Sequence, residues 1–500
     1  MRAVAEFAAR RGRVLALPLG AALALAFAPT HLWPLAVVLP ACLFLLWQGA
    51  SPREAAWRGF LFTAGTFAAG TYWLYHSIHL IGQAPVWLAL FLMLGLAAIM
   101  GSYSALAGWV VARWAPSRGL GRWLVLLPAA WVGVEWFRGW FLSGFPWLAL
   151  GYSQFDSPLI GYAPLLGVYG VSLAVAVLSG TCVAFLLGTR REQGLAGAVL
   201  VLVTAGGALG TKIEWTQPSG PAISVALVQG AVPQSMKWKP GQLEHTMRLY
   251  ADLTAPHLGA QIIVWPESAI PALESSIRDF LGSVQQATAA RGSSIIMGLV
   301  RHEAGSDNYY NGIAAWSPAE QWYYKRRLVP FGEFFPVPAR VREWMRLMNL
   351  PYSDFAAGPD DQAPLEAAGQ KLAPTVCYED AYGVEQLRLA RASTLLVNVT
   401  NDAWFGDSTA PHQHVDISRM RSLETGRPML RATNDGVTAL IAYDGQVISS
   451  LPQFRPGVLA GAVVPRTGLT PYLRYGNLPI LLLLFAGLAL PLAFARRSRA

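Results

Sequence analysis

The chain has 500 residues and a formal net charge of +9, with 54% hydrophobic and only 13% charged residues. Soluble domains usually contain about 25% charged residues, so this composition excludes an ordinary soluble protein. The basic residues lie beside apolar segments, which is typical of membrane topology and argues against a nucleic-acid partner.

Apolar segments before residue 211 and after residue 477 are long enough to cross a bilayer, which takes about 20 residues of helix. They predict a multi-span α-helical membrane bundle of about eight transmembrane helices. The expected spans are 14–30, 32–49, 59–80, 86–111, 123–141, 164–187, 194–210 and 478–495.

Arginine residues mark alternate connections between these spans. They lie before the first span, after the second, fourth and sixth spans, and after the last span: Arg2, Arg10, Arg11, Arg13, Arg53, Arg58, Arg113, Arg118, Arg122, Arg190, Arg191, Arg496, Arg497 and Arg499. Basic connections stay in the cytoplasm, so both termini are expected there. The predicted organisation is a membrane domain (1–210), an outer domain (211–477) and a final span with a basic tail (478–500).

The outer segment alternates between two kinds of pattern. Short β-rich runs occur at 222–230, 261–265, 293–300, 371–378 and 394–400. Helix-like stretches occur at 241–255, 272–290, 380–391 and 412–427. This alternation predicts an α/β sheet domain covered by helices. Residues 348–370, rich in Gly, Pro and Asp, are expected to form a long loop.

Cys377 is the only cysteine of this outer segment, since Cys42 and Cys182 fall in expected spans. A lone cysteine provides neither a disulfide framework nor a zinc site. As a nucleophile it needs a base or a positive neighbour. Glu267 and Lys325 each follow an apolar strand, and together the three side chains would suffice for acyl transfer. Spacing alone leaves an inert core cysteine as the commoner alternative.

Three motifs carry a resemblance to a known family. WPES at 265–268, K-x-x-L-V-P-F-G-E at 325–333 and V-C-Y-E-D at 376–380 resemble the Glu, Lys and Cys motifs of the nitrilase (carbon–nitrogen hydrolase) superfamily. Together with the expected spans, they resemble the apolipoprotein N-acyltransferase family. Further stretches that resemble it are GFPWLALGYSQ (144–154), QSMKW (234–238), NDAWFG (401–406) and the segment 412–436.

The resemblance implies a nitrilase-like αββα sandwich on the periplasmic side of the bundle. It implies that Glu267 is the general base, that Lys325 stabilises the intermediate and that Cys377 is the nucleophile. The supporting residues that it implies are Glu333 beside the lysine, Tyr378 and Glu379 in the pocket, and Trp238 on a mobile arm near the entrance.

The resemblance further implies a ping-pong reaction in the bacterial inner membrane. Cys377 would take an acyl chain from a phospholipid, and the N-terminal amine of a diacylglyceryl-cysteine on an apolipoprotein would then accept it. The partners expected are the phospholipid, the apolipoprotein and the bilayer. We expect no cofactor, no metal, no nucleic acid and a monomeric protein.

Two other functions remain open at this stage. A membrane-anchored nitrilase-type amidase would use the same three residues and pass the acyl group to water. A lipid transporter or binding protein would carry paired ionisable residues inside its spans. Glu135 and Arg138, at i and i+3 near one span end, could form a structural pair or contact a lipid headgroup.

His412 and His414 do not share a helix face, which favours a structural role for both.

Overall fold

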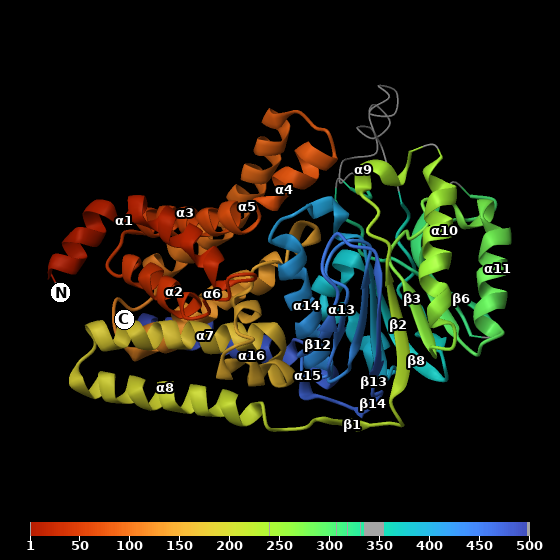
Figure 1. The fold of residues 1–500 in the computed structure, drawn as a ribbon. Coiled ribbons are helices and arrows are strands. Elements are labelled where there is room, and N and C mark those ends of the chain that lie inside the picture. Colours follow the sequence, from red (N-terminus) through yellow and green to blue (C-terminus); the bar gives the residue numbers. More distant parts are fainter. Residues whose placement is uncertain are drawn as a thin grey trace. The chain divides into compact units, whose positions relative to one another are not determined.

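The computed structural model describes residues 2–239, 241–306, 308–317, 319–330, 332–334 and 355–497. The chain divides into two compact units. The first contains Met1–Trp215, Asp407–Asp416 and Thr470–Ala500, and the second contains Thr216–Gly406 and Ile417–Leu469 (Figure 1).

The first unit is helical. Its longer helices are α1 (Arg2–Leu23), α2 (Leu35–Leu46), α3 (Pro52–Gly70), α5 (Val86–Trp114), α6 (Leu127–Arg138), α7 (Ala163–Leu187), α8 (Arg190–Gly210) and α16 (Leu478–Arg497). Shorter elements connect them: η1 (Ala24–Ala26), α4 (Trp73–Tyr75), η2 (His76–Ile81), η3 (Gly121–Leu126), η4 (Phe141–Ser143), η5 (Leu150–Ser153), η6 (Pro158–Tyr162) and α15 (Pro471–Tyr475).

Each expected span overlaps one of these helices, but two expected ends are wrong. The helix expected to reach residue 30 ends at Leu23, and the 3-10 segment η1 and turns that contain Pro29 and Pro34 follow it. The span expected at 59–80 breaks after Gly70, and the chain continues as α4 and the π-helix η2. Among the described helices, three segments are long and apolar enough to cross a membrane: Val86–Trp114, Pro158–Leu187 and Arg190–Gly210.

Helices α1 and α3 approach each other through glycine. A Cβ atom on Gly20 would lie 1.8 Å from the backbone oxygen of Phe62, and one on Gly65 would lie 2.3 Å from that of Leu17. Small residues allow such close backbone contact between apolar helices. This crossing therefore depends on the absence of side chains at two positions.

Glu135 and Arg138 at the end of α6 hold the irregular segment that follows it. Oε1 of Glu135 accepts hydrogen bonds from Trp131 Nε1 (2.9 Å) and from the backbone N–H of Leu150 (3.0 Å). A guanidinium nitrogen of Arg138 donates to the carbonyl oxygens of Phe145 (2.9 Å) and Trp147 (2.5 Å). Both side chains are buried, and their contacts favour the structural alternative for this pair.

Residues 407–416 pack among the helices of the first unit. Oε1 of Gln413 accepts hydrogen bonds from the indole N–H groups of Trp147 (2.7 Å) and Trp73 (3.2 Å), and its Nε2 donates to the carbonyl of Gly70 (3.1 Å). The buried ring of His414 lies 5.7 Å from that of Trp147. This stretch therefore helps to order the apolar interior of the helical unit.

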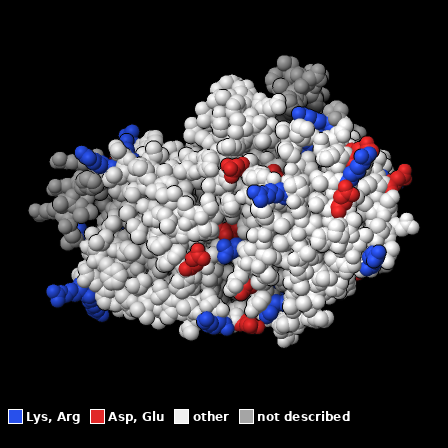
Figure 2. All heavy atoms as spheres, viewed as in Figure 1, with Lys and Arg blue, Asp and Glu red and all other residues white. Residues whose placement is uncertain are grey.

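Charge is unevenly distributed on the helical unit. Figure 2 shows basic side chains at one end of this unit and a broad uncharged surface beside them. The exposed arginines of the unit include Arg11, Arg13, Arg53, Arg113, Arg118, Arg190 and Arg191. A band without charge next to a basic end is typical of a membrane protein.

The described part of the second unit contains two six-stranded sheets. One has the order β13-β2-β3-β4-β5-β6 and the other β12-β11-β10-β9-β8-β7. The first is built from β13 (Gly457–Val463), β2 (Ile223–Gln229), β3 (Ile262–Trp265), β4 (Ser294–His302), β5 (Tyr309–Trp316) and β6 (Glu320–Tyr324). The second is built from β12 (Val447–Ser450), β11 (Ala439–Ile441), β10 (Met429–Thr433), β9 (Leu395–Thr400), β8 (Gln370–Val376) and β7 (Leu365–Ala367).

The centre of each sheet is parallel, and antiparallel strands flank it. Strand β3 pairs in parallel with β2 and β4, and β9 pairs in parallel with β8 and β10. These central strands are runs of buried Val, Ile and Leu, as expected for strands covered on both faces. Because parallel strands end at one sheet edge, the residues that follow them are brought together. A small sheet of β1 (Thr216–Pro218) and β14 (Arg466–Gly468) completes the unit.

Helices cover the outer face of each sheet. α10 (Gln242–Thr254) and α11 (Arg278–Ala289) pack on the first sheet through a core that includes Tyr250, Trp265 and Leu281 (Figure 1). α13 (Gly383–Arg391) and the Ile417–Thr425 part of α14 (Ala410–Thr425) lie on the second. Short elements include α9 (Gln234–Lys237), η7 (Ala255–His257), η8 (Glu274–Ser276), η9 (Cys377–Ala381) and η10 (Asp402–Phe405). The layers form the expected αββα sandwich.

The prediction of a long loop at 348–370 is wrong for its second half. Residues 348–354 lie outside the described residues. Residues Leu365–Ala367 form strand β7, which pairs antiparallel with β8. The connection is a two-residue turn in which Ala368 and Gly369 have φ values of 50° and 71°. Two positive φ angles are characteristic of tight hairpin turns, and the alternation of buried and exposed residues in β7 fits a strand.

Candidate active site

Glu267 lies two residues beyond β3 and is buried, with 7% of its surface exposed. Its Oε1 accepts a hydrogen bond from Asn311 Nδ2 (2.7 Å), and its Oε2 accepts one from the backbone N–H of Asn401 (2.9 Å). Both carboxylate oxygens are thus held by neutral donors. A carboxylate fixed in this way is suited to exchange a proton with a neighbouring group.

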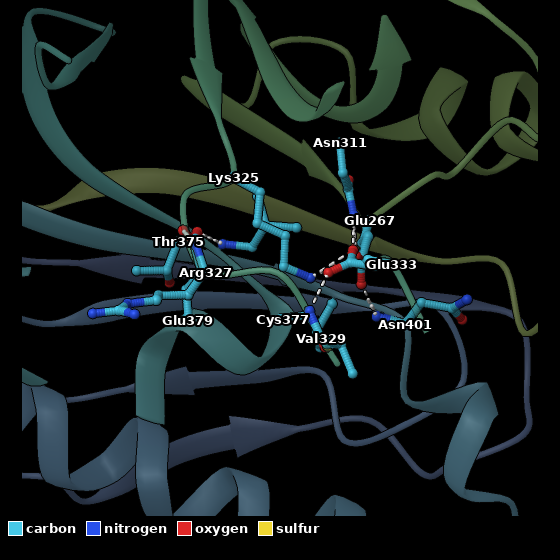
Figure 3. Close-up of polar contacts among 12 residues, drawn as sticks. Glu267, Asn311, Lys325, Arg327, Val329, Glu333, Thr375, Cys377, Glu379 and Asn401 are labelled. Atoms are coloured by element: carbon cyan, nitrogen blue, oxygen red, sulfur yellow. Dashed lines mark hydrogen bonds and ion pairs between the residues drawn. The ribbon is translucent and has the colours of Figure 1, made fainter. Parts of the chain in front are cut away.

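Lys325 follows β6, and its backbone N–H donates to the carbonyl of Asn311 (2.8 Å). Its Nζ lies 2.8 Å from Oε1 of Glu333 and 3.6 Å from Oε1 of Glu267, and the side chain is 1% exposed (Figure 3). Burial disfavours the charged ammonium, but Glu333 and Glu267 outweigh burial and raise the pKa of Lys325. The site therefore contains a permanent buried positive charge.

Cys377 begins η9 at the end of β8 and is 8% exposed. Its φ angle of 53° is in the left-handed region, which costs a residue other than glycine about 1–3 kcal/mol. Asn398 Nδ2 donates to its carbonyl oxygen (3.2 Å), which helps to hold this conformation. Strain of this kind is concentrated at functional sites.

The thiol of Cys377 is neutral in the resting site. Burial raises the pKa of the thiol well above its usual value, and the charge of Glu267 raises it further, while Lys325 opposes both. Glu267 and Lys325 therefore act on the same sulfur atom. The three residues named from the sequence converge on one site, and this sulfur needs a base to become nucleophilic.

Glu379 joins the cysteine turn to the lysine segment. Its Oε2 accepts the backbone N–H of Val376 (2.8 Å), and its Oε1 accepts the backbone N–H of Arg326 (2.6 Å) and the hydroxyl of Tyr323 (3.1 Å). Burial raises the pKa of Glu379, and the backbone hydrogen bonds and Lys325 oppose the increase. This carboxylate therefore sets the spacing between the segments that carry Lys325 and Cys377.

Tyr378 and Trp238, the two aromatic residues expected near the site, have different surroundings. The hydroxyl of Tyr382 donates to that of Tyr378 (2.8 Å), and the two rings meet edge to face at 5.2 Å. Trp238 directly follows α9 and is 58% exposed. An exposed indole is compatible with the expected place at an entrance, which stays a prediction.

Glu333 lies within the polar centre, where sequence motifs had placed it beside the lysine. Besides its ion pair with Lys325, its Oε2 accepts the backbone N–H of Val329 (2.8 Å). Its backbone oxygen accepts the N–H of Phe355 (3.0 Å). The carboxylate therefore neutralises Lys325 and also fixes the local chain.

Asn311 and Asn401 belong to the site but were not found from the sequence. Nδ2 of Asn311 donates to Oε1 of Glu267 (2.7 Å) and to Oε1 of Glu333 (2.8 Å), so one amide separates two carboxylates. Asn311 lies inside β5, a strand that was not predicted, so no strand-end signal marked it. Asn401 acts through its backbone N–H, which no side-chain pattern reveals.

Among the described residues, no His, Cys, Asp or Glu cluster is arranged to hold a metal ion.

Comparisons with known proteins find matches in both the helical unit and the sandwich unit. Residues 19–181 match the family described as apolipoprotein N-acyltransferase N-terminal domain, and residues 224–472 match the carbon–nitrogen hydrolase family. The chain is 42% identical over 492 residues to an apolipoprotein N-acyltransferase of Methylococcus capsulatus, covering 98% of this chain and 97% of that protein. A relative of the same name from Pseudomonas syringae is 43% identical over 491 residues, covering 96% of each chain.

The chain belongs to the apolipoprotein N-acyltransferase family. The resemblance inferred from the motifs is thereby confirmed, and so is the carbon–nitrogen hydrolase fold of the second unit. A solved amidase of the nitrilase superfamily from Nesterenkonia, 19% identical, covers 53% of this chain and 97% of its own chain with a TM-score of 0.38. The family assignment depends on the relatives that match nearly the whole chain.

Proposed function

We propose that this chain is a membrane enzyme that transfers an acyl chain from a phospholipid to the N-terminal amine of a diacylglyceryl-cysteine on an apolipoprotein. The observation that carries the proposal is the identity of 42–43% with apolipoprotein N-acyltransferases over nearly the whole chain. The buried Glu267, Lys325 and Cys377 supply the base, the positive charge and the nucleophile that acyl transfer requires.

In the first half-reaction, Glu267 takes the proton of the Cys377 thiol as the sulfur attacks the ester carbonyl of the phospholipid. The ammonium of Lys325 stabilises the negative oxygen of the tetrahedral intermediate. The carbon–oxygen bond to the glycerol then breaks, and Glu267 returns the proton to the leaving oxygen. The products are a thioester on Cys377 and a lysophospholipid.

In the second half-reaction, the amine of the apolipoprotein attacks the thioester carbonyl. An amide bond forms, the carbon–sulfur bond breaks, and the thiol of Cys377 is restored. Water must be kept from the thioester for the amine to be the acceptor. The burial of Cys377 and Lys325 supports a dry site.

We further propose that the helical unit crosses the bacterial inner membrane about eight times, with residues 211–477 in the periplasm and both termini in the cytoplasm. The proposed domains are 1–210, 211–477 and 478–500. The exposed arginines on alternate connections and the uncharged surface of the helical unit support this arrangement. Two substrates that are embedded in a bilayer also require an enzyme that is anchored there.

The test is intact-protein mass spectrometry after incubation with phospholipid in a membrane-like environment without acceptor. We expect a mass gain of one acyl chain that hydroxylamine removes and that is absent in Cys377→Ala. Addition of a diacylglyceryl-cysteine peptide should transfer the chain to its amine. No adduct on the folded wild-type protein would contradict covalent catalysis, and release of free fatty acid instead of the amide would favour an amidase.

A further inference from the structure

A row of three polar side chains crosses the second sheet beside the turn that carries Cys377. Thr375 of β8, Asn398 of β9 and Arg431 of β10 are register partners on neighbouring parallel strands. Register partners in a sheet point to the same face. All three are buried, and Arg431 has no exposed surface. A charged side chain is rarely buried so completely without partners, so its charge must be balanced inside the unit.

The guanidinium of Arg431 is held by acceptors from three segments. Its Nη2 donates to Oδ2 of Asp402 in η10 (3.0 Å), and its Nη1 donates to Oγ of Ser418 in α14 (2.9 Å). Nη1 also lies 3.6 Å from Oδ2 of Asp380 in η9, which accepts the hydroxyl of Ser418 (2.5 Å). Two carboxylates and a hydroxyl thus fix the position of one planar cation.

A further contact of this guanidinium orients a neutral amide. Nη1 of Arg431 donates to Oδ1 of Asn398 (2.8 Å). A guanidinium can only donate hydrogen bonds, so the amide of Asn398 must turn its oxygen toward Arg431. Its nitrogen then faces the other way, where Nδ2 donates to the carbonyl oxygen of Cys377 (3.2 Å) and to Oγ1 of Thr375 (3.0 Å). Arg431 therefore determines which end of the amide faces the cysteine.

The hydrogen bond to the Cys377 carbonyl bears on the backbone conformation of that residue. The peptide group between Cys377 and Tyr378 is planar, so fixing its oxygen fixes one side of the cysteine. With a φ angle of 53°, Cys377 keeps a conformation that persists only where the surroundings enforce it. An amide turned the other way would place its oxygen against the carbonyl oxygen, and the two acceptors would repel. The left-handed turn thus depends on the orientation of Asn398.

We propose that Arg431 is a positioning residue for the nucleophile and that, acting through Asn398, it holds Cys377 in the turn from which the sulfur attacks. This inference rests on the proposed acyl transfer. In this role Arg431 contacts neither the phospholipid nor the sulfur, so it affects the rate of the chemical step and not the binding of the donor. A misplacement of about 1 Å at a reacting group can cost on the order of 10²-fold in rate.

The experiment compares the full-length wild type with Arg431→Lys and Asn398→Leu. The lysine keeps a positive charge for Asp380 and Asp402 but loses the planar fork that also reaches Asn398. The leucine keeps a similar shape and removes the hydrogen bonds of the amide. Mass spectrometry measures the acyl gain on Cys377 at increasing phospholipid concentration. In both variants we expect the saturating rate to fall on the order of 10²-fold, with the half-saturating concentration unchanged.

The double variant Arg431→Lys/Asn398→Leu tests whether one side chain acts through the other. If it does, the double variant should be no slower than Asn398→Leu alone, because the contact that Arg431 controls is already lost. Losses that multiply, to on the order of 10⁴-fold, would show that the two residues act independently and would overturn the inference.

The matched control is Arg427→Lys, since Arg427 is another buried arginine of the same unit. Its Nε donates to the carbonyl of Ser393 (2.8 Å) and its Nη2 to that of Gly468 (2.8 Å). Thermal unfolding in detergent should show a lower Tm for Arg427→Lys, as for Arg431→Lys, because each loses hydrogen bonds of a buried guanidinium. We expect Arg427→Lys nevertheless to form the thioester at the wild-type rate.

An unchanged saturating rate in Arg431→Lys or Asn398→Leu would overturn the inference, as would an equal loss of rate in Arg427→Lys. A change confined to the half-saturating concentration would also overturn it, because that would place the residues in phospholipid binding. If Arg431→Lys did not fold, the saturating rate of Asn398→Leu would decide alone. Failure of the wild type to form a thioester would instead overturn the proposed function, and the inference with it.

Discussion

At the scale of single residues, the site separates charges by means of neutral amide groups. Asn311 donates from one nitrogen to Glu267 and Glu333, whose carboxylates both lie near Lys325. The three ionisable side chains therefore share one buried volume, and the amide of Asn311 bridges the two carboxyl groups. Glu267 is the proposed base, and this amide holds one of its carboxylate oxygens in place.

The first prediction concerns Asn311→Asp. The new side chain replaces an N–H donor with an oxygen and adds a third carboxylate between Glu267 and Glu333. We expect thioester formation to fall on the order of 10²-fold, because the change replaces the donor that holds the proposed base Glu267 with a repelling carboxylate. The measurement is the rate of the acyl mass gain with phospholipid. The exposed Asn308→Asp serves as the control, and an unchanged rate in Asn311→Asp would refute the role of the amide.

The second prediction separates the reactivity of the thiol from catalysis. The charge of Glu267 is one cause of the raised pKa of Cys377, so Glu267→Gln should lower that pKa and increase the thiolate fraction. We therefore expect alkylation of Cys377 by iodoacetamide at pH 8 to be faster in Glu267→Gln than in wild type. Thioester formation should meanwhile be lost, because no base remains to return a proton to the leaving group.

Peptide mapping of the alkylated cysteine and the phospholipid mass assay measure the two rates on the same preparations. Glu244→Gln, an exposed change on α10, should alter neither rate. If alkylation and thioester formation both slowed in Glu267→Gln, the charge of Glu267 would not be what holds the proton on sulfur.

At the scale of elements, the sequence predicted the strands and helices that a local apolar pattern marks. It missed the strands that depend on pairing with neighbouring strands. The buried runs of β2, β3, β4, β8 and β9 and the helices α10 and α13 were found within one to three residues, because apolar periodicity marks them directly. Strands β5, β6, β7, β10, β11, β12 and β13 were not. Most of them are short or contain polar residues, and β13 contains two glycines, which weaken a strand pattern. Their partner strands hold them in place.

The same distinction applies to the candidate site. Glu267, Lys325 and Cys377 were found because each follows an apolar strand and lies in a recognisable motif. Asn311 was not found because it lies within a strand that has no such signal, and Asn401 because it contacts Glu267 through its backbone N–H. Burial and proton affinity arise from tertiary contacts, so composition and spacing do not reveal them.

The third prediction concerns the crossing of α1 and α3. Gly20→Ala places a Cβ atom 1.8 Å from the carbonyl oxygen of Phe62, which forces the helices apart. We expect a loss of stability of at least about 2 kcal/mol, within the usual range for overpacking. The control is Gly95→Ala on α5, where a Cβ meets open space and improved helix propensity should be neutral or favourable. Thermal unfolding in detergent compares the two, and equal Tm values would argue against the crossing.

At the scale of the whole molecule, the chain combines a helical unit with a carbon–nitrogen hydrolase sandwich. The matches to the two family models cover parts of both units, so the family is defined by the helical unit as well as by the sandwich. The exposed arginines on alternate connections give the proposed orientation a physical basis.

The fourth prediction tests that orientation. In a background with Cys42, Cys182 and Cys377 changed to alanine, single cysteines replace Gly220 of the sandwich unit or Arg191 of the connection between α7 and α8. We expect an impermeant maleimide to label Gly220→Cys in intact spheroplasts, and to label Arg191→Cys only after permeabilisation. Labelling of both sites, or of Arg191→Cys alone, in intact spheroplasts would contradict the proposed topology.

The neutral state of Cys377 has a further consequence for survival of the enzyme under oxidative stress. Peroxides attack thiolates far more readily than thiols, and over-oxidation to sulfinic acid is seldom reversed. The nearest neighbours of this sulfur include no second thiol that could rescue it, as Cys42 and Cys182 lie in the helical unit. The raised pKa therefore protects the sulfur chemically. In the proposed reaction a thiolate forms only while an ester occupies the site, and the bound ester then keeps the oxidant away from the sulfur.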